Sequence, residues 1–362
     1  MQKLDKLMIK INNTIIANNS QTYFIADIAA NHDSSLGRAK ELIYLAAESG
    51  ADAAKFQHFK ARNIVSDKGF KQLGGQQSHQ SAWKKSVFEV YEDASLNLDW
   101  TNSLKETCDD AGIAFLTSPY DFDLVDYVEP YISAYKIGSG DITWIEMIER
   151  IAKKQKPYII ASGASTFDEV DKAVTAALKI NTQLCLMQCN TNYTASLENF
   201  QYIQLNVLKS YRSMYPELVL GLSDHTPGHA TVLGAVTLGA RVIEKHFTDS
   251  VNRAGPDHKF SMNPLSWQEM VDRTRELENA LGSGVKRIEN NEKETVVLQR
   301  RSIYAKSDLI RGTILTRDKL DVLRPCPTSA ISPDRMTSIL GKRLRNDVSA
   351  GECIKWESLE SV

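Results

Sequence analysis

The feature that most constrains the fold is a regular alternation of short apolar runs with amphipathic stretches. The apolar runs are rich in β-branched and aromatic residues, as strands are, and cover residues 23–29, 53–57, 113–117, 134–137, 158–161, 184–188, 219–222 and 241–246. The intervening stretches have helical periodicity and cover 36–49, 96–111, 124–128, 144–154, 166–178, 197–211, 228–238 and 264–281. Eight strand–helix units in about 260 residues predict an α/β fold, a (β/α)8 TIM barrel.

A doubly wound sheet is the competing fold. It usually has fewer strands, and no GxGxxG turn follows the first strand here. One polar stretch, 66–85, interrupts the alternation after the second strand. A loop of that length within a domain is commonly functional, and this one is expected over the carboxyl-end mouth of the barrel.

The chain changes character after the last barrel helix. Residues 1–283 are predicted to form the catalytic barrel and 284–299 a charged linker. Residues 300–362 contain short β-like pieces separated by turns. They predict a small β-rich module that is close to the lower size limit for an independent core.

The charge and composition of the chain limit the classes of binding partner. Lys and Arg number 43 against 45 Asp and Glu, a net charge of −2. No basic excess points to nucleic acid or to an anionic membrane. The start lacks the pattern of a secretory signal, no apolar run reaches about 18 residues, and the five cysteines do not suggest a disulfide framework. A cytoplasmic protein without nucleic-acid or membrane partners is expected.

Barrel enzymes place their active sites at the carboxyl ends of the strands. Polar residues expected there include Asp27, Lys55, Gln57, Ser118, Lys136, Ser139, Asp141, Ser162, Tyr193, Ser223, His225, Glu244 and His246. Lysine ammonium groups, serine hydroxyls and glycine-flanked amides together favour a small-anion pocket. The clearest case is KIGSGD at 136–141, although a plain strand-to-helix turn with a surface lysine is an equal alternative.

His225 and His246 follow adjacent predicted strands. Two imidazoles there can converge on one Mn, Fe, Co or Zn ion and leave positions for substrate and water. A hydrogen-bonded structural role is the alternative for each. His32 and His58 are weaker candidates, and His79 receives no ligand role.

Asp27 and Asp141 offer carboxylates at the same end of the barrel. Such groups can carry protons or orient water, or they can pair with Lys55 or Lys136. A metal, an anion pocket and acids suggest chemistry on a phosphorylated or carboxylated carbon acid. Residue types alone leave open an aldolase, a phosphatase-like lyase and a phosphoenolpyruvate-dependent synthase.

Several motifs then occur in order along nearly the whole chain. They are ADIAANHDSSLGRAKELI (26–43), GADAAKFQ (50–57), TSPYD (117–121), AYKIGSGD (134–141), ASGAST (161–166), QCNTNY (188–193), GLSDHT (221–226), IEKHFT (243–248) and RAGPDHKFSMNP (253–264). Together they closely resemble the sialic acid synthase family, whose members make N-acetylneuraminic, legionaminic and pseudaminic acids. The segment from Arg300 resembles the antifreeze-like (SAF) domain that ends these enzymes.

The resemblance implies a transferase that condenses phosphoenolpyruvate with an N-acyl amino-sugar aldehyde and water. It implies a divalent metal on His225 and His246, Mn²⁺ first and Mg²⁺ or Co²⁺ as alternatives. The implied phosphoenolpyruvate ligands are Lys55, Ser118, Lys136, Ser139, Gly140, Ser162 and Ser223. The implied sugar contacts are Gln57, Tyr193, Asp257 and Arg324, and the catalytic residues Asp27, Lys55, Lys136 and Asp141. A domain-swapped homodimer, with Arg324 reaching the partner's site, is also implied.

The chain departs from the family pattern at some of these positions. Asp27 and Asp141 stand where the pattern has glutamate, and Ala161 where serine is frequent. Most departures fall on the sugar side, so the aldehyde could be N-acetylmannosamine or a 2,4-diacetamido hexose. A metal-dependent pyruvate aldolase and a non-catalytic carbohydrate-binding protein are the alternative functions.

Overall fold

The computed structural model describes residues 8–73, 76 and 78–360. Residues 74, 75 and 77 of the predicted insertion lie outside the described residues. Contacts divide the chain into two units, Met1–Gly282 and Ser283–Val362. Each unit is considered by itself below.

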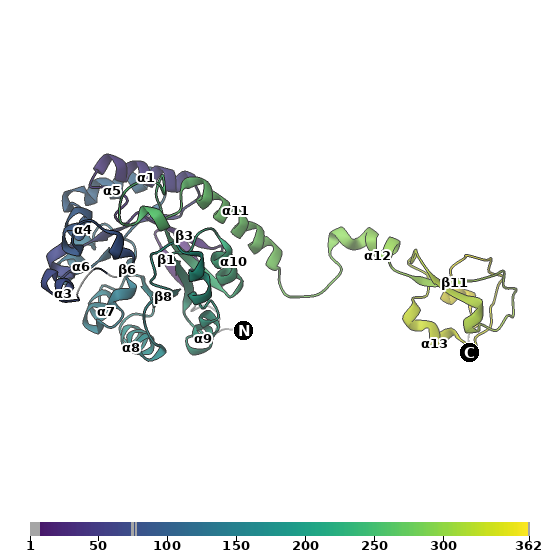
Figure 1. Ribbon diagram of the computed structural model, residues 1–362. Helices are drawn as coiled ribbons and strands as arrows, with labels where there is room; N and C mark the ends of the chain where they lie inside the picture. Colours follow the sequence, from purple (N-terminus) through teal and green to yellow (C-terminus); the bar gives the residue numbers. More distant parts are fainter. Residues whose placement is uncertain (1–7, 74–75, 77, 361–362) are drawn as a thin grey trace. The chain divides into compact units, whose positions relative to one another are not determined.

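The first unit is a parallel barrel surrounded by helices (Figure 1). Within the described residues, eight strands close in the order β10, β3, β4, β5, β6, β7, β8, β9. Their bounds are β3 Tyr23–Asp27, β4 Ala53–His58, β5 Ala114–Pro119, β6 Tyr135–Ile137, β7 Tyr158–Ala161, β8 Leu184–Cys189, β9 Val219–Asp224 and β10 Ala240–His246. The predicted TIM barrel is confirmed.

Helices follow the strands on the outside. They are α1 Leu36–Glu48, α2 Ala61–Ile64, α3 Asp67–Gln72, α4 Val87–Ala94, α5 Thr101–Asp110, α6 Phe122–Val128, α7 Ile145–Ala152, α8 Phe167–Leu178, α9 Val207–Met214, α10 Ala230–Thr237 and α11 Pro264–Leu281. Side-chain caps define several starts: the Thr166 hydroxyl accepts from Glu169 N at the start of α8, and Pro264 opens α11 after its cap Asn263. None of the helices in the described residues is long and apolar enough to cross a membrane.

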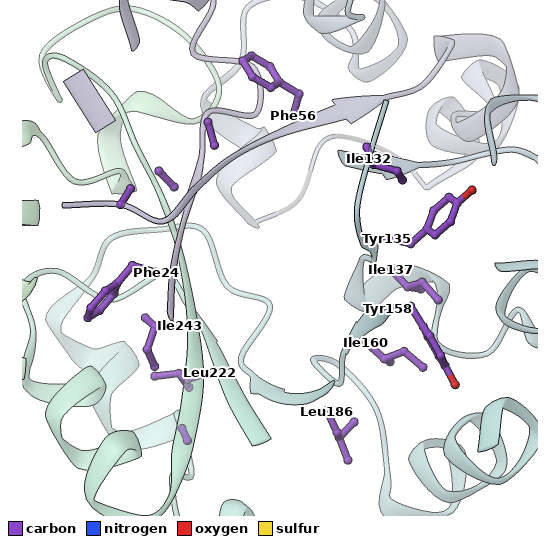
Figure 2. Packing of buried hydrophobic residues seen from close by; sticks show 14 of the residues in the cluster. Phe24, Phe56, Ile132, Tyr135, Ile137, Tyr158, Ile160, Leu186, Leu222 and Ile243 are labelled. Atoms are coloured by element: carbon purple, nitrogen blue, oxygen red, sulfur yellow. The ribbon is translucent and has the colours of Figure 1, made fainter. Parts of the chain in front are cut away.

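Alternate residues of each strand face two different cores. One set packs between strands and helices, and Figure 2 shows part of this layer, including Phe24, Phe56 and Tyr158. The other set, which includes Tyr23 and Ile25, fills the barrel interior. Strands buried on both faces explain why the sequence shows continuous apolar runs there rather than alternation.

The amino-terminal hairpin was not predicted. Strands β1 (Met8–Ile11) and β2 (Thr14–Ala17) pair antiparallel, and Ile9, Ile11 and Ile16 join the interior core near the strand starts. Strands of only four residues carry a weak sequence signal, and apolar residues lie on both faces of this hairpin, since Met8 and Ile15 are exposed. This end is therefore packed with apolar side chains, which leaves the opposite end for polar chemistry.

Two predicted segments differ from the structure. The helix predicted over 197–211 is broken: a 3₁₀ turn, η4 (Leu197–Tyr202), precedes α9. Gln204 between them has φ of +52°, a left-handed conformation that ends a right-handed helix. The polar insertion is not a plain loop, since it contains α3 and the 3₁₀ turn η1 (Ser78–Ala82).

The second unit has a small core of its own. Strands β11 (Ser302–Ala305) and β12 (Leu320–Leu323) pair antiparallel, and isolated bridges join further short segments. Helix α13 (Met336–Ile339) packs here, and Ile303, Leu315 and Ile354 are buried. The expected linker 284–299 belongs to this unit by its contacts, and its second half forms helix α12 (Lys293–Gln299).

Candidate active site

The carboxyl end of the barrel holds a buried network of opposite charges. Lys55 Nζ donates to Asp27 Oδ2 at 2.6 Å, and Lys136 Nζ donates to Glu244 Oε1 at 3.0 Å. Lys55 Nζ also lies 3.9 Å from Glu244 Oε2, and the Ser223 hydroxyl donates to Glu244 Oε1 at 3.1 Å. All five side chains are almost fully buried.

Strand register explains why these residues meet. Asp27 is paired with Lys55 on one side and with His246 on the other, and Glu244 is paired with Ser223. Each is an even number of residues beyond an interior core position of its strand, so its side chain enters the barrel. The closed sheet therefore concentrates the polar residues of separate strands at one end.

Glu244 is the main site residue without a predicted role. It stands two residues before His246 and two after the interior residue Val242, and this spacing alone could have placed it inside the barrel. Burial opposes its ionisation, but the Lys136 and Lys55 ammonium groups lower its pKa overall. Burial raises the pKa of Asp27, while the Lys55 charge opposes that rise.

Several buried polar atoms at this end have no hydrogen-bond partner among the described residues. They include Ser118 Oγ, Glu244 Oε2 and His246 Nδ1. An unmade hydrogen bond on a buried group costs about 1–3 kcal/mol, so atoms of this kind indicate room for a ligand. Their strands, β5 and β10, bring a hydroxyl donor, a carboxylate oxygen and an imidazole nitrogen to the same end of the barrel.

The other predicted phosphoenolpyruvate ligands differ in whether they line the cavity at the barrel mouth. Ser139 and Gly140 lie in the 3₁₀ turn η3 (Ser139–Asp141) and line the cavity at the barrel mouth. Ser162 does not line that cavity. Its hydroxyl donates to the Met187 carbonyl at 2.9 Å and accepts from Tyr211 at 2.8 Å, so both of these interactions tie it to neighbouring elements.

Close packing beside the predicted phosphoenolpyruvate ligands explains why residue 163 is a glycine. A Cβ on Gly163 would overlap Thr191 Oγ1 and Ser139 Oγ, whereas a Cβ on Gly140 would meet nothing within 4 Å. Gly163 lets β7 end against these side chains. The open space beside Gly140 leaves room for a ligand.

The two predicted metal ligands converge. The ring centroids of His225 and His246 are 5.5 Å apart. His225 Nδ1 lies 3.0 Å from the Asn190 carbonyl oxygen, and donation there leaves Nε2 as the free lone pair. Since the buried His246 Nδ1 has no partner, both rings offer a nitrogen, and the pair fits one divalent ion.

Further protein ligands are not grouped around this pair. Among the described residues there is no set of three or more His, Cys, Asp or Glu side chains placed to hold a metal. The nearest carboxylates, Asp27 and Asp257, lie 3.6 Å and 3.9 Å from the two nitrogens of His246. A metal on two imidazoles would keep its other positions for water and substrate.

The weaker histidine candidates have structural partners instead. His58 is buried between the Thr117 and Thr101 hydroxyls at 2.7 Å and 2.9 Å. His32 Nδ1 accepts from Ser34 N at 3.1 Å. Burial lowers the pKa of each imidazole to about 4, so both rings stay neutral at physiological pH.

A buried ion pair anchors the segment that carries His225. The Lys245 ammonium donates to the Asp224 carboxylate and, at 2.6 Å, to the Thr226 carbonyl oxygen. Thr231 Oγ1 also donates to Asp224 at 2.8 Å. The residues on both sides of His225 are therefore fixed to β10 and α10, which explains the precise placement of an imidazole at a strand end.

A cavity of about 440 Å³ opens above this network. Gln57, Asp141, Tyr193, His246 and Asp257 line it, so the first unit brings the predicted sugar contacts to one place. Gln57 Nε2 donates to Asp27 Oδ2 at 3.3 Å, and Asp257 Oδ2 accepts from Ala30 N at 3.1 Å. Burial raises the pKa of Asp141 and of Asp257 to about 6 in each case.

The remaining predicted sugar contact lies in the second unit. Arg324 is exposed, and its Nε donates to the Gln299 carbonyl oxygen at 2.7 Å. Its role at a partner's site stays a prediction.

The sequence residues 42–286 match the NeuB family, and 300–360 match the SAF domain. An N,N'-diacetyllegionaminic acid synthase of Legionella pneumophila is 34% identical over 97% of this chain and 99% of its own length. A pseudaminic acid synthase of Campylobacter jejuni is 31% identical over 92% of this chain and 96% of its own.

A solved structure agrees with these sequence matches. It is an N-acetylneuraminic acid (sialic acid) synthetase from Leptospira borgpetersenii in complex with citrate. It is 25% identical, covers 80% of this chain and 95% of its own, and superposes with a TM-score of 0.70. The resemblance inferred from the motifs is confirmed: the chain belongs to the NeuB family and ends in a SAF domain.

Proposed function

We propose that this enzyme condenses phosphoenolpyruvate with an N-acyl amino-sugar aldehyde and water, forming a nonulosonic acid and phosphate. The observation that carries the proposal is the group of unpartnered buried atoms, Ser118 Oγ, Glu244 Oε2 and His246 Nδ1, at the barrel end that holds Lys55 and Lys136. The relatives, which are named as synthases of this class of acid, support it.

The charged end of the barrel is suited to phosphoenolpyruvate. Lys55 and Lys136 supply fixed positive charge, and Ser118, Ser139 and Ser223 supply directed donors. Glu244 holds both ammonium groups in place through its two oxygens. Because these groups are buried and need little reorganisation, their interactions with a bound anion are stronger than in water.

His225 and His246 would hold the divalent metal. When bound, Mn²⁺ or a similar ion supplies Lewis-acid polarisation of the aldehyde oxygen. Tyr193 lies against the histidine pair, with its ring centroid 4.4 Å from that of His225, and excludes water from that side. Gln57 and Asp257, which line the cavity, would orient the sugar chain.

The bond changes follow from these positions. C3 of phosphoenolpyruvate forms a bond to the aldehyde carbon with the electron pair of its C2=C3 double bond, which leaves C2 electron-deficient and the aldehyde oxygen as an alkoxide. Water adds at C2, and the proton that it releases ends on this alkoxide, which becomes a hydroxyl. The tetrahedral intermediate then loses inorganic phosphate, which takes the proton of the C2 hydroxyl as C2 becomes a ketone. Asp27, between Lys55 and His246, is placed to accept the proton of the attacking water, and Asp141 would help to position the sugar.

Phosphate release tests this function. The full-length protein is incubated with phosphoenolpyruvate, Mn²⁺ and a panel of 2-acetamido and 2,4-diacetamido hexoses, and both phosphate and product mass are measured. We expect phosphate and a nine-carbon acid in equal amounts from at least one aldehyde. Absence of phosphate with every aldehyde would contradict the proposal, and condensation of the same aldehydes with added pyruvate would instead indicate an aldolase.

We also propose a domain-swapped homodimer in which Arg324 completes the partner's site. The test mixes two inactive variants, Arg324→Ala and Lys136→Ala, after separating and reassociating the subunits. A residue acting in trans leaves one intact site in each mixed dimer, so about a quarter of the wild-type activity returns. No recovery in verified mixed dimers would contradict the swap. A cytoplasmic location stays a prediction.

A further inference from the structure

The insertion after β4 contributes two aromatic rings to the mouth cavity. His79 and Trp83, from η1 and the residue that follows it, line the cavity together with Gln80. Their ring centroids are 5.4 Å apart and the rings meet edge to face. Neither residue takes part in the mechanism proposed above.

These rings adjoin the residue that is expected to contact the sugar. The His79 ring centroid lies 5.0 Å from that of Tyr193, again edge to face. The Tyr193 ring centroid in turn lies 4.4 Å from that of His225 and 6.2 Å from that of His246. Tyr193 therefore contacts both His79 and the histidines that would hold the metal. A sugar chain whose aldehyde lies at the histidines would present its far end to His79 and Trp83.

The cavity that the ring pair lines has apolar residues beside its polar ones. Phe59, Ile64 and Val90 line the same cavity. Gln80 and the half-buried His79 are the nearby polar groups from the insertion, and the His79 ring makes no hydrogen bond to any described residue. An apolar wall with a few polar groups accepts a methyl group and an amide better than a series of hydroxyls.

The charge of the cavity limits the sugar further. Among the described residues that line it, none is Lys or Arg, whereas Asp141 and Asp257 are acidic. A phosphate on the sugar would find no cation from these residues and would be repelled by ionised Asp141. The cavity thus favours an aldehyde without a phosphate group.

We infer that His79 and Trp83 determine substrate specificity by receiving the second N-acyl group of an uncharged 2,4-diacetamido hexose. This inference rests on the proposed synthase function. In this arrangement the acetamido methyl group packs on the indole of Trp83, and the amide group lies where His79 and Gln80 can form hydrogen bonds with it. N-acetylmannosamine would place a hydroxyl group against the same rings.

The test compares Trp83→Ala and Trp83→Phe with the wild-type enzyme. Loss of an apolar contact in a specificity pocket costs about 10- to 200-fold in discrimination. We expect Trp83→Ala to lower kcat/KM for the 2,4-diacetamido hexose in that range, and kcat/KM for N-acetylmannosamine by less than about threefold. The KM for phosphoenolpyruvate should not change, and Trp83→Phe should restore most of the discrimination. His79→Ala serves as a second variant with the same expected direction.

A purely structural role of the ring would give a different result. Equal losses with both aldehydes, or a parallel change in the KM for phosphoenolpyruvate, would overturn the inference. So would faster turnover of N-acetylmannosamine 6-phosphate than of N-acetylmannosamine. If the wild-type enzyme turns over no aldehyde at all, the proposed function fails instead.

Binding of the unreactive sugar alcohols separates the two failures further. The alcohols made by reducing both aldehydes are titrated by calorimetry into the metal-loaded protein. The 2,4-diacetamido alcohol should bind at least about tenfold more weakly to Trp83→Ala than to the wild type. Unchanged affinity would contradict the inference whether or not the enzyme shows turnover.

Discussion

The two halves of the barrel mouth are built in different ways. The inner half consists of side chains on strands, where Lys55, Lys136 and Glu244 are nearly fully buried and joined by ion pairs of 3.9 Å and 3.0 Å. The outer half consists of residues on loops and turns, such as His79 and Tyr193, that are half-buried and held mainly by ring contacts. A fixed inner half suits the substrate that family members would share, while a loop-built outer half can change with the sugar.

The largest expected effect is at the junction of the two halves. If His246 holds the proposed metal ion, His246→Ala weakens the binding of the ion that polarises the aldehyde, so kcat should fall roughly a thousandfold, because Lewis-acid stabilisation is worth several kcal/mol. Phosphate release with saturating substrates and metal binding by calorimetry measure this. His229→Ala, a half-buried histidine outside the site, is the matched control. Unchanged metal affinity in His246→Ala would show that His246 is not a metal ligand.

The inner network should respond strongly to loss of one charge. Glu244→Gln keeps the shape but leaves the buried Lys136 ammonium without its carboxylate. Breaking a buried pair in this way costs about 3–5 kcal/mol of unfolding free energy, measured by urea unfolding. Glu129→Gln breaks a pair with Lys154 that is much more exposed and should cost less than about 1 kcal/mol. Similar losses of unfolding free energy in the two variants would show that the buried ion pairs of the inner half stabilise the fold no more than a surface pair does.

Two glycines at the carboxyl end of the barrel, Gly163 and Gly140, allow a closely packed position to be compared with an open one. Gly163→Ala would force a methyl group into Thr191 and Ser139, and should lower the unfolding free energy by about 1–3 kcal/mol. Gly140→Ala meets open space and should change it by less than about 0.5 kcal/mol. Thermal unfolding of both variants checks this. A tolerated Gly163→Ala would mean that the closely packed region can relax.

The smallest expected effect is the pH response of the outer half. Because burial raises the pKa of Asp141 from 3.8 to about 6, this group is protonated below and ionised above that pH. If its carboxylate positions the sugar, kcat/KM should fall as pH falls through about 6. Asp141→Asn should lower kcat/KM about tenfold at pH 8 and remove that part of the pH dependence. A pH profile that is identical in both proteins would exclude Asp141.

The sequence predicted much of this site because barrel geometry follows from local patterns. The predicted strand ends indicated that Lys55, Lys136, Ser223 and the histidine pair lie at one end of the barrel, since parallel strands bring their carboxyl ends together. Glu244 was seen at a strand end but received no role, because its contacts with two lysines join strands that are far apart in the sequence. The hydrogen bonds that occupy Ser162 likewise depend on Met187 and Tyr211, which are distant in the chain.

By itself, the sequence determined the eight-stranded barrel, the separate carboxyl-terminal module and the residue types at the strand ends, because periodicity and motifs act over short distances along the chain. The tertiary structure decided which of those residues touch. It joined Glu244 to both lysines, left Ser118 and His246 with free polar atoms, and brought His79, which contacts Trp83, beside Tyr193. These outcomes depend on sheet closure and on the path of the insertion, which residue spacing alone does not specify.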